Sequence, residues 1–125
     1  MPANTTPIFP GSIINSLVKI SDNTDTTEHV IFTAGENGAR VDSIICYNTD
    51  DDPIGVSLFI KDAANTIELG NVTLDSKTKT DLVKELDFEL TDNAIYIAST
   101  NSLAIKITQT GNGSALDIAV FGGSY

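Results

Sequence analysis

The sequence lacks several residue types on which whole classes of function depend. Tryptophan is absent, and cysteine, histidine and arginine occur once each, as Cys46, His29 and Arg40. A single cysteine excludes both an intramolecular disulfide framework and a cysteine-based zinc site. Because Cys46 lies in the apolar run SIICY, we expect a buried thiol with no reactive role.

Positive charge is also scarce. Seven Lys and Arg residues stand against 17 Asp and Glu residues, which gives a formal net charge of -10 at pH 7. Proteins bind nucleic acids mainly through Lys and Arg side chains that neutralise phosphates, and a net charge of this sign repels DNA, RNA and anionic lipid. We therefore expect no nucleic acid and no membrane among the partners, and we assign the charge to solubility.

Long apolar runs are missing as well. No run approaches the roughly 20 residues of a membrane-spanning helix. The first cation is Lys19, so the N-terminal region lacks the basic segment of a secretory signal. The sequence therefore predicts a protein that is made in a cytoplasm and is not exported by the usual route.

What the chain does have is a series of short runs in which apolar and polar residues alternate. Such runs, separated by turns rich in Asn, Asp and Gly, predict strands. We expect strands near 14–20, 28–34, 40–48, 55–61, 66–74, 83–90, 94–99, 102–109 and 115–121. An open sheet with so many strands curls or splits into two layers. The expected fold class is therefore all-β: an antiparallel β-sandwich of jelly-roll or similar Greek-key topology, forming one domain over residues 13–125.

The alternation also predicts the core. Residues on one face of each strand point into the sandwich, while their neighbours point to the other face. We expect the core to consist mostly of Ile20, Ile31, Phe32, Ile44, Leu58, Ile60, Leu74, Phe88, Ile97, Ile105, Ile107 and Ile118. Adjacent apolar residues such as Ile31 and Phe32 point opposite ways, so some of this set must face a second layer or another subunit.

One stretch, DLVKELDFEL (81–90), fits two structures. A short amphipathic helix would place Leu82, Leu86 and Leu90 on one face, whereas a strand would alternate Leu86, Phe88 and Leu90. We favour the strand, because the alternation is regular and the rest of the chain shows strand patterns.

Residues 1–12 differ from the rest and predict an extended N-terminal arm. Three of the four prolines lie here, and proline fixes φ and lacks a donor, so neither a helix nor a central strand suits the segment. Ile8 and Phe9 stand between Pro7 and Pro10. Large apolar residues in such a segment suggest that Pro7, Ile8, Phe9 and Pro10 dock on the chain's own domain or on a neighbour during assembly.

Signatures of chemistry are weak throughout. His29 has no GxSxG segment to complete a hydrolase triad, and no GxGxxG or P-loop pattern predicts a nucleotide site. Glu85, Asp87 and Glu89 would share one face of a strand. They suit a solvent face that discourages aggregation better than a glycosidase pair or a cation site. The run Asp50 to Asp52 reads as a solvated turn. We therefore expect no catalytic residues, metal ligands or cofactor, and no dedicated carbohydrate site, given an aromatic content of 6%.

The segment FTAGENGARVD (32–42) is unusually specific for a loop between two strands. Gly35, Asn37 and Gly38 tolerate positive φ, and we expect Gly35 or Gly38 to adopt it. Arg40 follows, and its guanidinium can hold a carboxylate of Asp42 or of a neighbouring subunit. These residues are candidates for a structural or subunit contact rather than for catalysis.

Three segments together resemble a known group of proteins. TPIFP (6–10), FTAGENGARVD and the closing AVFGGSY (119–125) are similar to segments of small virion structural proteins from tailed bacteriophages and prophages. The three segments occur in the same order and span nearly the whole chain. Where such proteins often have a Pro-x-Gly turn, this chain has Leu90 to Ala94, so that hairpin is expected to differ. The resemblance implies a component of a phage particle without enzymatic activity.

Two placements in a particle follow as expectations. The first is an accessory (decoration or cement) protein on the exterior of the capsid, made in the bacterial cytoplasm, bound to the major capsid protein and assembled as a homo-oligomer, most simply a trimer. The second is a tail, baseplate or fibre module that contacts a host receptor. A small enzyme such as a glycan hydrolase is a third reading. A flat apolar face would favour decoration, exposed aromatics in a groove would favour receptor binding, and two convergent carboxylates would favour an enzyme.

Overall fold

The structure is a computed structural model in which residues 12–88 and 91–125 are described. The arm candidates Pro7 to Pro10, and also Glu89 and Leu90, lie outside the described residues. The described elements are nine strands and one helix: β1 (Ser12–Ile20), β2 (Glu28–Thr33), β3 (Ala39–Asn48), β4 (Ile54–Lys61), β5 (Thr66–Leu74), β6 (Lys79–Asp81), α1 (Leu82–Glu85), β7 (Ile95–Ile97), β8 (Ser102–Gln109) and β9 (Leu116–Ser124).

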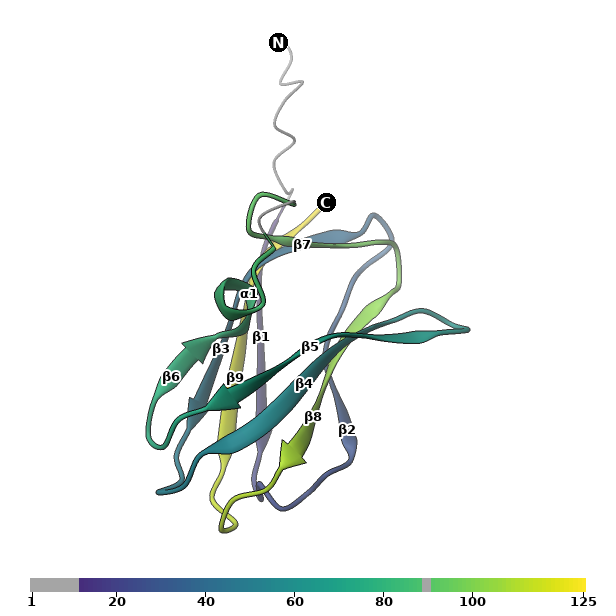
Figure 1. Cartoon of the computed structure of the whole chain (residues 1–125). Coiled ribbons are helices and arrows are strands. Elements are labelled where there is room, and N and C mark those ends of the chain that lie inside the picture. Colours follow the sequence, from purple (N-terminus) through teal and green to yellow (C-terminus); the bar gives the residue numbers. More distant parts are fainter. Residues whose placement is uncertain (1–11, 89–90) are drawn as a thin grey trace.

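The strands form two antiparallel sheets that face each other (Figure 1). One sheet has five strands, in the order β1-β9-β3-β6, with β7 also paired to β3; the other has the order β2-β8-β4-β5. This alternation of strands between two layers is the jelly-roll arrangement of two Greek keys. The predicted all-β sandwich is therefore confirmed.

Strands β6 and β7 occupy one strand position that is interrupted. Lys79–Asp81 pairs with one half of β3, and Ile95–Ile97 pairs with the other half, both antiparallel. Residues 82–88 and 91–94, which lie between the two halves in the chain, are not paired in the sheet. The return turn contains two left-handed residues, Asp92 (φ 56°) and Asn93 (φ 59°), and is closed by the Thr91 hydroxyl, which donates to the Ala94 carbonyl at 2.6 Å. The turn therefore gains its positive φ angles without glycine.

The prediction of a strand over 83–90 is wrong, because Leu82 to Glu85 form helix α1. Asp81 caps the helix: its Oδ1 accepts from the backbone N–H of Val83 and of Ile44, both at 3.1 Å. The adjacent Leu82 and Val83 are both buried, the first two residues of the helix. The short-helix alternative for this segment describes these four residues correctly.

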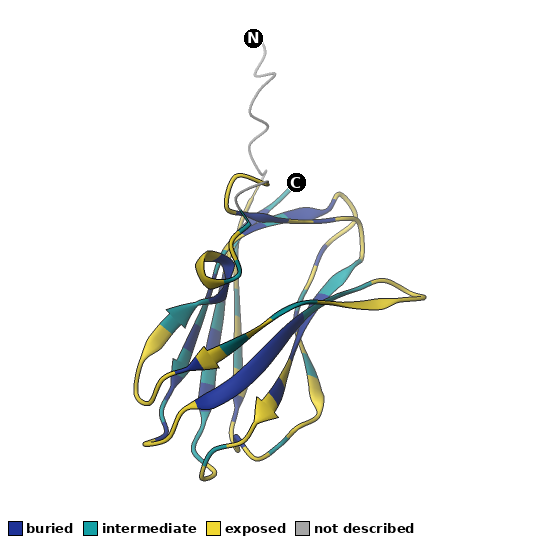
Figure 2. Ribbon diagram, in the orientation of Figure 1, coloured by how far each residue is buried: buried dark blue, intermediate teal, exposed yellow. Residues whose placement is uncertain are grey.

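The core lies between the two sheets (Figure 2). The apolar side chains at its centre are almost fully buried, and Ile44, Leu58 and Ile105 have no more than 1% of their surface exposed. Nine of the twelve predicted core residues are buried: Ile20, Ile31, Ile44, Leu58, Leu74, Ile97, Ile105, Ile107 and Ile118. The other three, Phe32, Ile60 and Phe88, are partly buried and pack against this cluster. Each fully buried aliphatic side chain contributes roughly 1.5–3 kcal/mol.

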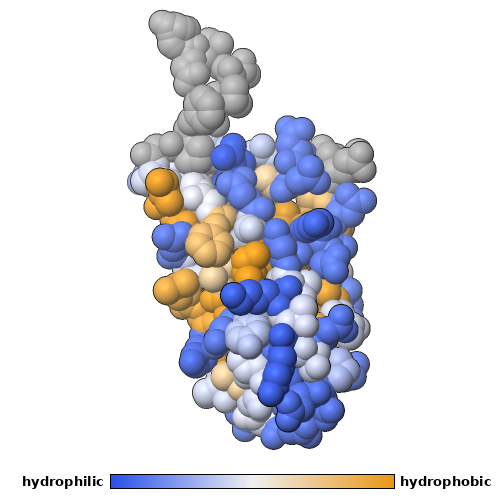
Figure 3. Space-filling model, turned by 90° about the vertical axis from the view of Figure 1, so that its left-hand side faces the viewer, coloured by the Kyte–Doolittle hydropathy of each residue, from blue (hydrophilic) through white to orange (hydrophobic). Residues whose placement is uncertain are grey.

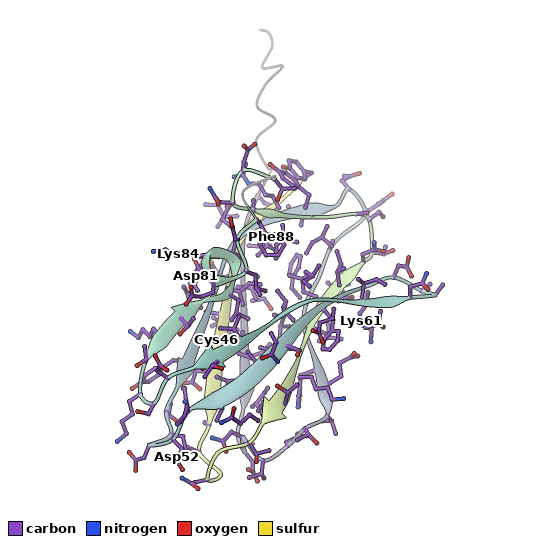
Figure 4. All side chains as sticks on the ribbon, in the orientation of Figure 1. Cys46, Asp52, Lys61, Asp81, Lys84 and Phe88 are labelled. Atoms are coloured by element: carbon purple, nitrogen blue, oxygen red, sulfur yellow. The ribbon has the colours of Figure 1, made fainter. Side chains whose placement is uncertain are left out.

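Cys46 belongs to this core and is fully buried (Figure 4), as predicted. Burial raises the pKa of its thiol to about 12, with a further contribution from Asp81. The thiol is therefore protonated and behaves as a small apolar side chain.

At the end of the sandwich away from β7, a polar network ties four loops together. Asp50 is 1% exposed, so the prediction of a solvated turn at this residue is wrong. Its carboxylate accepts from Asn23 Nδ2 (2.8 Å) and from the backbone N–H groups of Asp52 (3.0 Å) and Asn112 (2.8 Å). These hydrogen bonds, that from Asn23 first, hold the Asp50 pKa well below its usual range. The carboxylate thus serves as the hydrogen-bond acceptor for the backbone N–H groups of Asp52 and Asn112 in these loops.

Asn48, the last residue of β3, extends this network. Its side chain is buried and donates to the carbonyl oxygens of Asp52 (2.9 Å), Leu74 (3.1 Å) and Asp75 (3.2 Å). The side-chain amide oxygen of Asn48, Oδ1, accepts from the backbone N–H of Asp50 at 3.0 Å. Both the nitrogen and the oxygen of the Asn48 side-chain amide therefore form hydrogen bonds that connect loop segments.

No helix in the part of the chain that the structure describes has the length and apolar character needed to cross a bilayer.

Candidate docking face

The outer face of the five-stranded sheet carries apolar side chains that the core does not use. Strand β1 shows the cause most clearly, because apolar residues occupy both of its faces. Ile14, Val18 and Ile20 point toward the sandwich, whereas Ile13 (87% exposed) and Leu17 (76% exposed) point outward. An outward face built this way exposes apolar surface to water.

The strand register arranges the outward residues in rows across the sheet. Ile13, Gly123, Arg40 and Tyr96 form the first row, at the end where β7 lies. The next rows are Asn15, Phe121 and Ser43; then Leu17, Ala119, Ile45 and Asp81; then Lys19, Asp117, Tyr47 and Lys79. We call the apolar members Ile13, Leu17, Ile45, Tyr47, Ala119 and Phe121 the docking face. Figure 3 views this side, and apolar side chains gather over its left and central parts.

A groove lies over the last two of these rows, toward the end of the docking face away from β7. It has a volume of about 330 Å³, and Leu17, Ile45, Tyr47 and Ala119 contribute to its lining. Lys79 stands at its rim with its Nζ 5.9 Å from the centroid of the Tyr47 ring, a cation–π distance. On the opposite rim, Lys19 Nζ lies 3.5 Å from Asp117 Oδ1. The groove therefore has an apolar floor and charged edges.

The outer face of the other sheet is different in character. Asn71 Nδ2 donates to Ser57 Oγ (2.9 Å) and to Thr108 Oγ1 (3.0 Å), joining β5, β4 and β8 through polar side chains. Lys61, labelled in Figure 4, pairs with Glu28 across the sheet. The exposed apolar residues Val30 and Ile67 lie on β2 and β5, the two opposite edge strands of this sheet. Val30, Ala104 and Phe59 form one apolar row on this face, but Ala104 is buried and Phe59 is partly buried. This face therefore exposes less large apolar side chain than the docking face does.

The loop predicted to need positive φ lies at the end of the docking face. Gly38 has φ +78°, which confirms the prediction, while Gly35 has no positive φ. The Gly38 N–H donates to the Gly35 carbonyl at 3.1 Å and closes a four-residue turn in which Asn37 is exposed. A side-chain carbon on Gly38 would lie 2.7 Å from the carbonyl oxygen of Ile97, so glycine is required both for its φ and for space.

Arg40 and Asp42 form an ion pair beside this turn. Arg40 Nε lies 3.0 Å from Asp42 Oδ1, which is the intramolecular partner expected. The register of β3 on β9 shifts between Val41 and Ser43, so Asp42 is the extra residue of a β-bulge. The ion pair is partly exposed at the first row of the face.

The segments that carry the sequence resemblance are neighbours in space. The ARVD part of FTAGENGARVD pairs with the FGGS part of AVFGGSY: Ala39 is opposite Ser124, Arg40 opposite Gly123 and Val41 opposite Gly122. Ser12, the first described residue, is also opposite Ser124. The arm segment is therefore attached at the same end of the molecule, although its residues lie outside the described chain.

Nothing in the described residues supports a catalytic or metal centre. His29 Nε2 lies 3.1 Å from Asp25 Oδ2 at the start of β2, an interaction that orders the neighbouring turn. Residues 12–88 and 91–125 contain no group of three or more His, Cys, Asp or Glu placed to hold a metal ion. The predicted row of Glu85 and Asp87 on one strand face is wrong, because Glu85 ends α1 and Asp87 adopts φ 56° in the following turn.

Sequence reasoning singled out the loop residues but missed most of the docking face. The signal was present in two segments, SIINSLVKI and SIICYN, where apolar residues occupy both faces of one strand. Strands of this kind are normally covered on both sides. The sandwich covers one side of β1 and β3, and the outward residues Ile13, Leu17, Ile45 and Tyr47 mark the side that it leaves uncovered.

Comparison with known proteins gives distant structural likeness. No family model matches this chain, and no curated protein matches it. A solved chain from work on Bacillus endospore appendages, described there as a novel family of disulfide-linked pili, matches with 10% sequence identity. The match covers 98% of this chain and 99% of that chain with a TM-score of 0.46. A likeness at this level carries no argument about function, which is argued below from the docking face.

Proposed function

We propose that this chain is a non-enzymatic structural protein of a phage particle, and that it adds to the exterior of the capsid as a decoration (cement) protein. The observation that carries the proposal is the contrast between the two outer faces. The docking face exposes Ile13, Leu17 and Phe121, which form an apolar surface suited to burial against another protein. The polar outer face of the other sheet would remain in water.

Charge supports the exterior position. A net charge of -10 is repelled by packaged DNA, so the inner surface of a filled capsid is unfavourable. The major capsid protein is then the partner. The subunits assemble as a homo-oligomer with closed symmetry, and a trimer is proposed by analogy with decoration proteins that occupy three-fold positions. The resemblance of TPIFP, FTAGENGARVD and AVFGGSY to virion structural proteins points the same way.

The test is addition of purified protein to heads that lack it, with the bound copies counted against the major capsid protein. Leu17→Asp places a charge in the docking face and is expected to weaken binding roughly tenfold or more, because it removes the burial of one Leu side chain. Val30→Asp, on β2 of the other sheet, is the matched control and should bind like the wild type. Equal binding of all three proteins would contradict the proposal.

A second placement, at the tail, baseplate or fibre, is favoured by a different feature. Tyr96, 49% exposed, and Tyr125 line a hollow of about 440 Å³ together with Asn37 and Glu36. Exposed aromatic rings beside polar groups suit contact with a receptor. Imaging of intact particles separates the two: many copies over the head support decoration, whereas a few copies at the tail tip would replace it with the receptor-binding function.

A further inference from the structure

We propose that the groove of the docking face receives the Ile8–Phe9 segment of a second copy of this chain. The proposal rests on the homo-oligomer of the proposed function and names the contact that would build it. It does not depend on where in a particle the oligomer sits.

The groove has the chemistry that an apolar peptide requires. Its floor is formed by outward side chains of three adjacent strands, with Leu17 on β1, Ala119 on β9 and Ile45 on β3 in one row. Tyr47 and Lys79 close one side. A volume of about 330 Å³ lies at the lower end of the range of small ligand pockets. The groove is thus large enough for apolar side chains and too small for a whole structural element.

The arm has the complementary chemistry. Residues 2–12 carry no charged side chain, although the whole chain has a net charge of -10. An uncharged arm approaches a second acidic copy without the repulsion that an acidic segment would meet. Prolines at positions 7 and 10 restrict the segment around Ile8 and Phe9 to extended conformations. Docking then orders few additional torsion angles, which lowers its entropic cost.

Chain length excludes docking of the arm on its own sheet. The groove begins at Leu17, five residues along β1 from Ser12, which corresponds to about 17 Å at the rise of a strand. Phe9 precedes Ser12 by three residues, so its Cα lies at most about 11 Å from that of Ser12, and the Cα of Ile8 at most about 14 Å, even when the chain is fully extended. A side chain adds several ångström to this reach, but docking on its own sheet also requires the chain to reverse direction within Pro10 and Gly11, which shortens the reach along β1 by more than that. The donor of Ile8 and Phe9 is therefore another copy.

An exchange of this type has a defined symmetry. The arm is attached at Ser12, at one end of the sheet, whereas the groove lies over the rows near the other end, so the donor and acceptor surfaces differ. Each copy gives one arm and receives one arm. Two copies can do this reciprocally about a two-fold axis, and a head-to-tail exchange closes into a larger ring, such as the proposed trimer, when the rotation closes.

The experiment uses two full-length variants, each with its own affinity tag, made in the same cells. One carries Thr6→Cys, which leaves Ile8 and Phe9 in place; the other carries Lys79→Cys at the rim of the groove. The native Cys46 is buried and does not compete. A bismaleimide should join the two variants into a species that carries both tags. Thr108→Cys, exposed on the outer face of the other sheet, replaces Lys79→Cys as the control and should give little of that species.

Two further variants test the contact itself. Phe9→Ala in the Thr6→Cys chain, or Leu17→Asp in the Lys79→Cys chain, is expected to lower the yield of the double-tagged species roughly tenfold, because each removes one buried apolar side chain. Val30→Asp should leave it unchanged. The inference is overturned if the control position cross-links equally, if no double-tagged species forms, or if a chain carrying both cysteines links only within itself at high dilution. All of these are measured without capsids, so failure of capsid binding is a separate result.

Discussion

Gly122 lies directly against the backbone of Arg40. A side-chain carbon on Gly122 would overlap the Arg40 carbonyl oxygen and would lie 2.9 Å from the Cα of Val41. This close approach occurs where the bulge at Asp42 shifts the register between β3 and β9. The contact joins the two most specific sequence segments of the chain through their backbones, so the glycine is required for packing.

Replacing Gly122 with alanine is therefore expected to destabilise the protein by about 1–3 kcal/mol, the usual cost of forcing extra atoms into a packed site. Urea unfolding followed by circular dichroism measures this. Gly35→Ala is the matched control, since a side-chain carbon there would meet only Ser124 Oγ, at 3.9 Å. If Gly122→Ala and Gly35→Ala have the same midpoint, the close approach is not a constraint.

At Gly38 the expected loss has a different cause. Valine at this position must adopt φ +78° and must also displace the Ile97 carbonyl. We expect Gly38→Val to cost about 1 kcal/mol or more. Gly35→Val, without positive φ, should cost less in the same urea titration. A larger loss at Gly35 would contradict the assignment of the turn.

Asp50 should make stability depend on acid pH. Its pKa in the folded protein is held below the ordinary value by hydrogen bonds, first that from Asn23. Its contribution is therefore fully present above the unfolded pKa, about 3.9, and is lost as the pH falls from there through the lower folded pKa. The difference in unfolding free energy between wild type and Asp50→Asn should be large at neutral pH and shrink below about pH 4.

The control for Asp50 is its neighbour Asp51, whose side chain is 82% exposed and pairs with Lys77 at 2.9 Å. A surface pair of this kind contributes little, so Asp51→Asn should follow the wild type at every pH. Comparing variants also removes the acid dependence that Asp22, Asp25 and Asp62 share with both proteins. A constant gap between wild type and Asp50→Asn would show that the charge of Asp50 is not involved.

The thiol of Cys46 should be inert until the protein unfolds. Burial raises its pKa to about 12, so at about pH 8.5, where an ordinary thiol is half ionised, Cys46 remains a protonated core residue. Iodoacetamide should leave the native protein unmodified by mass spectrometry and should modify it fully in concentrated urea. Rapid labelling of the native protein would mean that β3 opens, or that Cys46 is not buried.

The fold was predictable because most strands show a local alternation of apolar and polar residues. Segments such as SLAIKITQ alternate apolar and polar residues, and β8 follows that pattern with Leu103, Ile105 and Ile107 inside. DLVKELDFEL failed because two local patterns competed. Asp81 decided between them as a helix cap, but its other acceptor role, toward the Ile44 N–H, depends on a strand 37 residues away.

The burial of Asp50 could not be predicted for the same reason. Three consecutive aspartates in a turn suggest water as their partner. Nothing in the local sequence indicates that Asn23 and Asn112, from two distant loops, donate hydrogen bonds to Asp50. The docking face was predictable only in part. Apolar residues on both faces of β1 were visible in the sequence, but only the sheet order shows that Ile45 and Ala119 join Leu17 in one row.

The position of β9 inside the five-stranded sheet has a consequence for how the chain is made. A ribosome delivers β1 and β3 early. Until residues Leu116–Ser124 have emerged and inserted between them, β1 has no partner strand among the described residues, and β3 is paired on one side only, by β6 and β7. Until then the nascent chain presents unpaired strand edges next to the apolar residues Ile13, Leu17 and Ile45, a combination prone to aggregation. Closure by the last strand means that the sandwich forms only after translation has passed Ser124, and that fragments ending before β9 are substrates for chaperones and proteases.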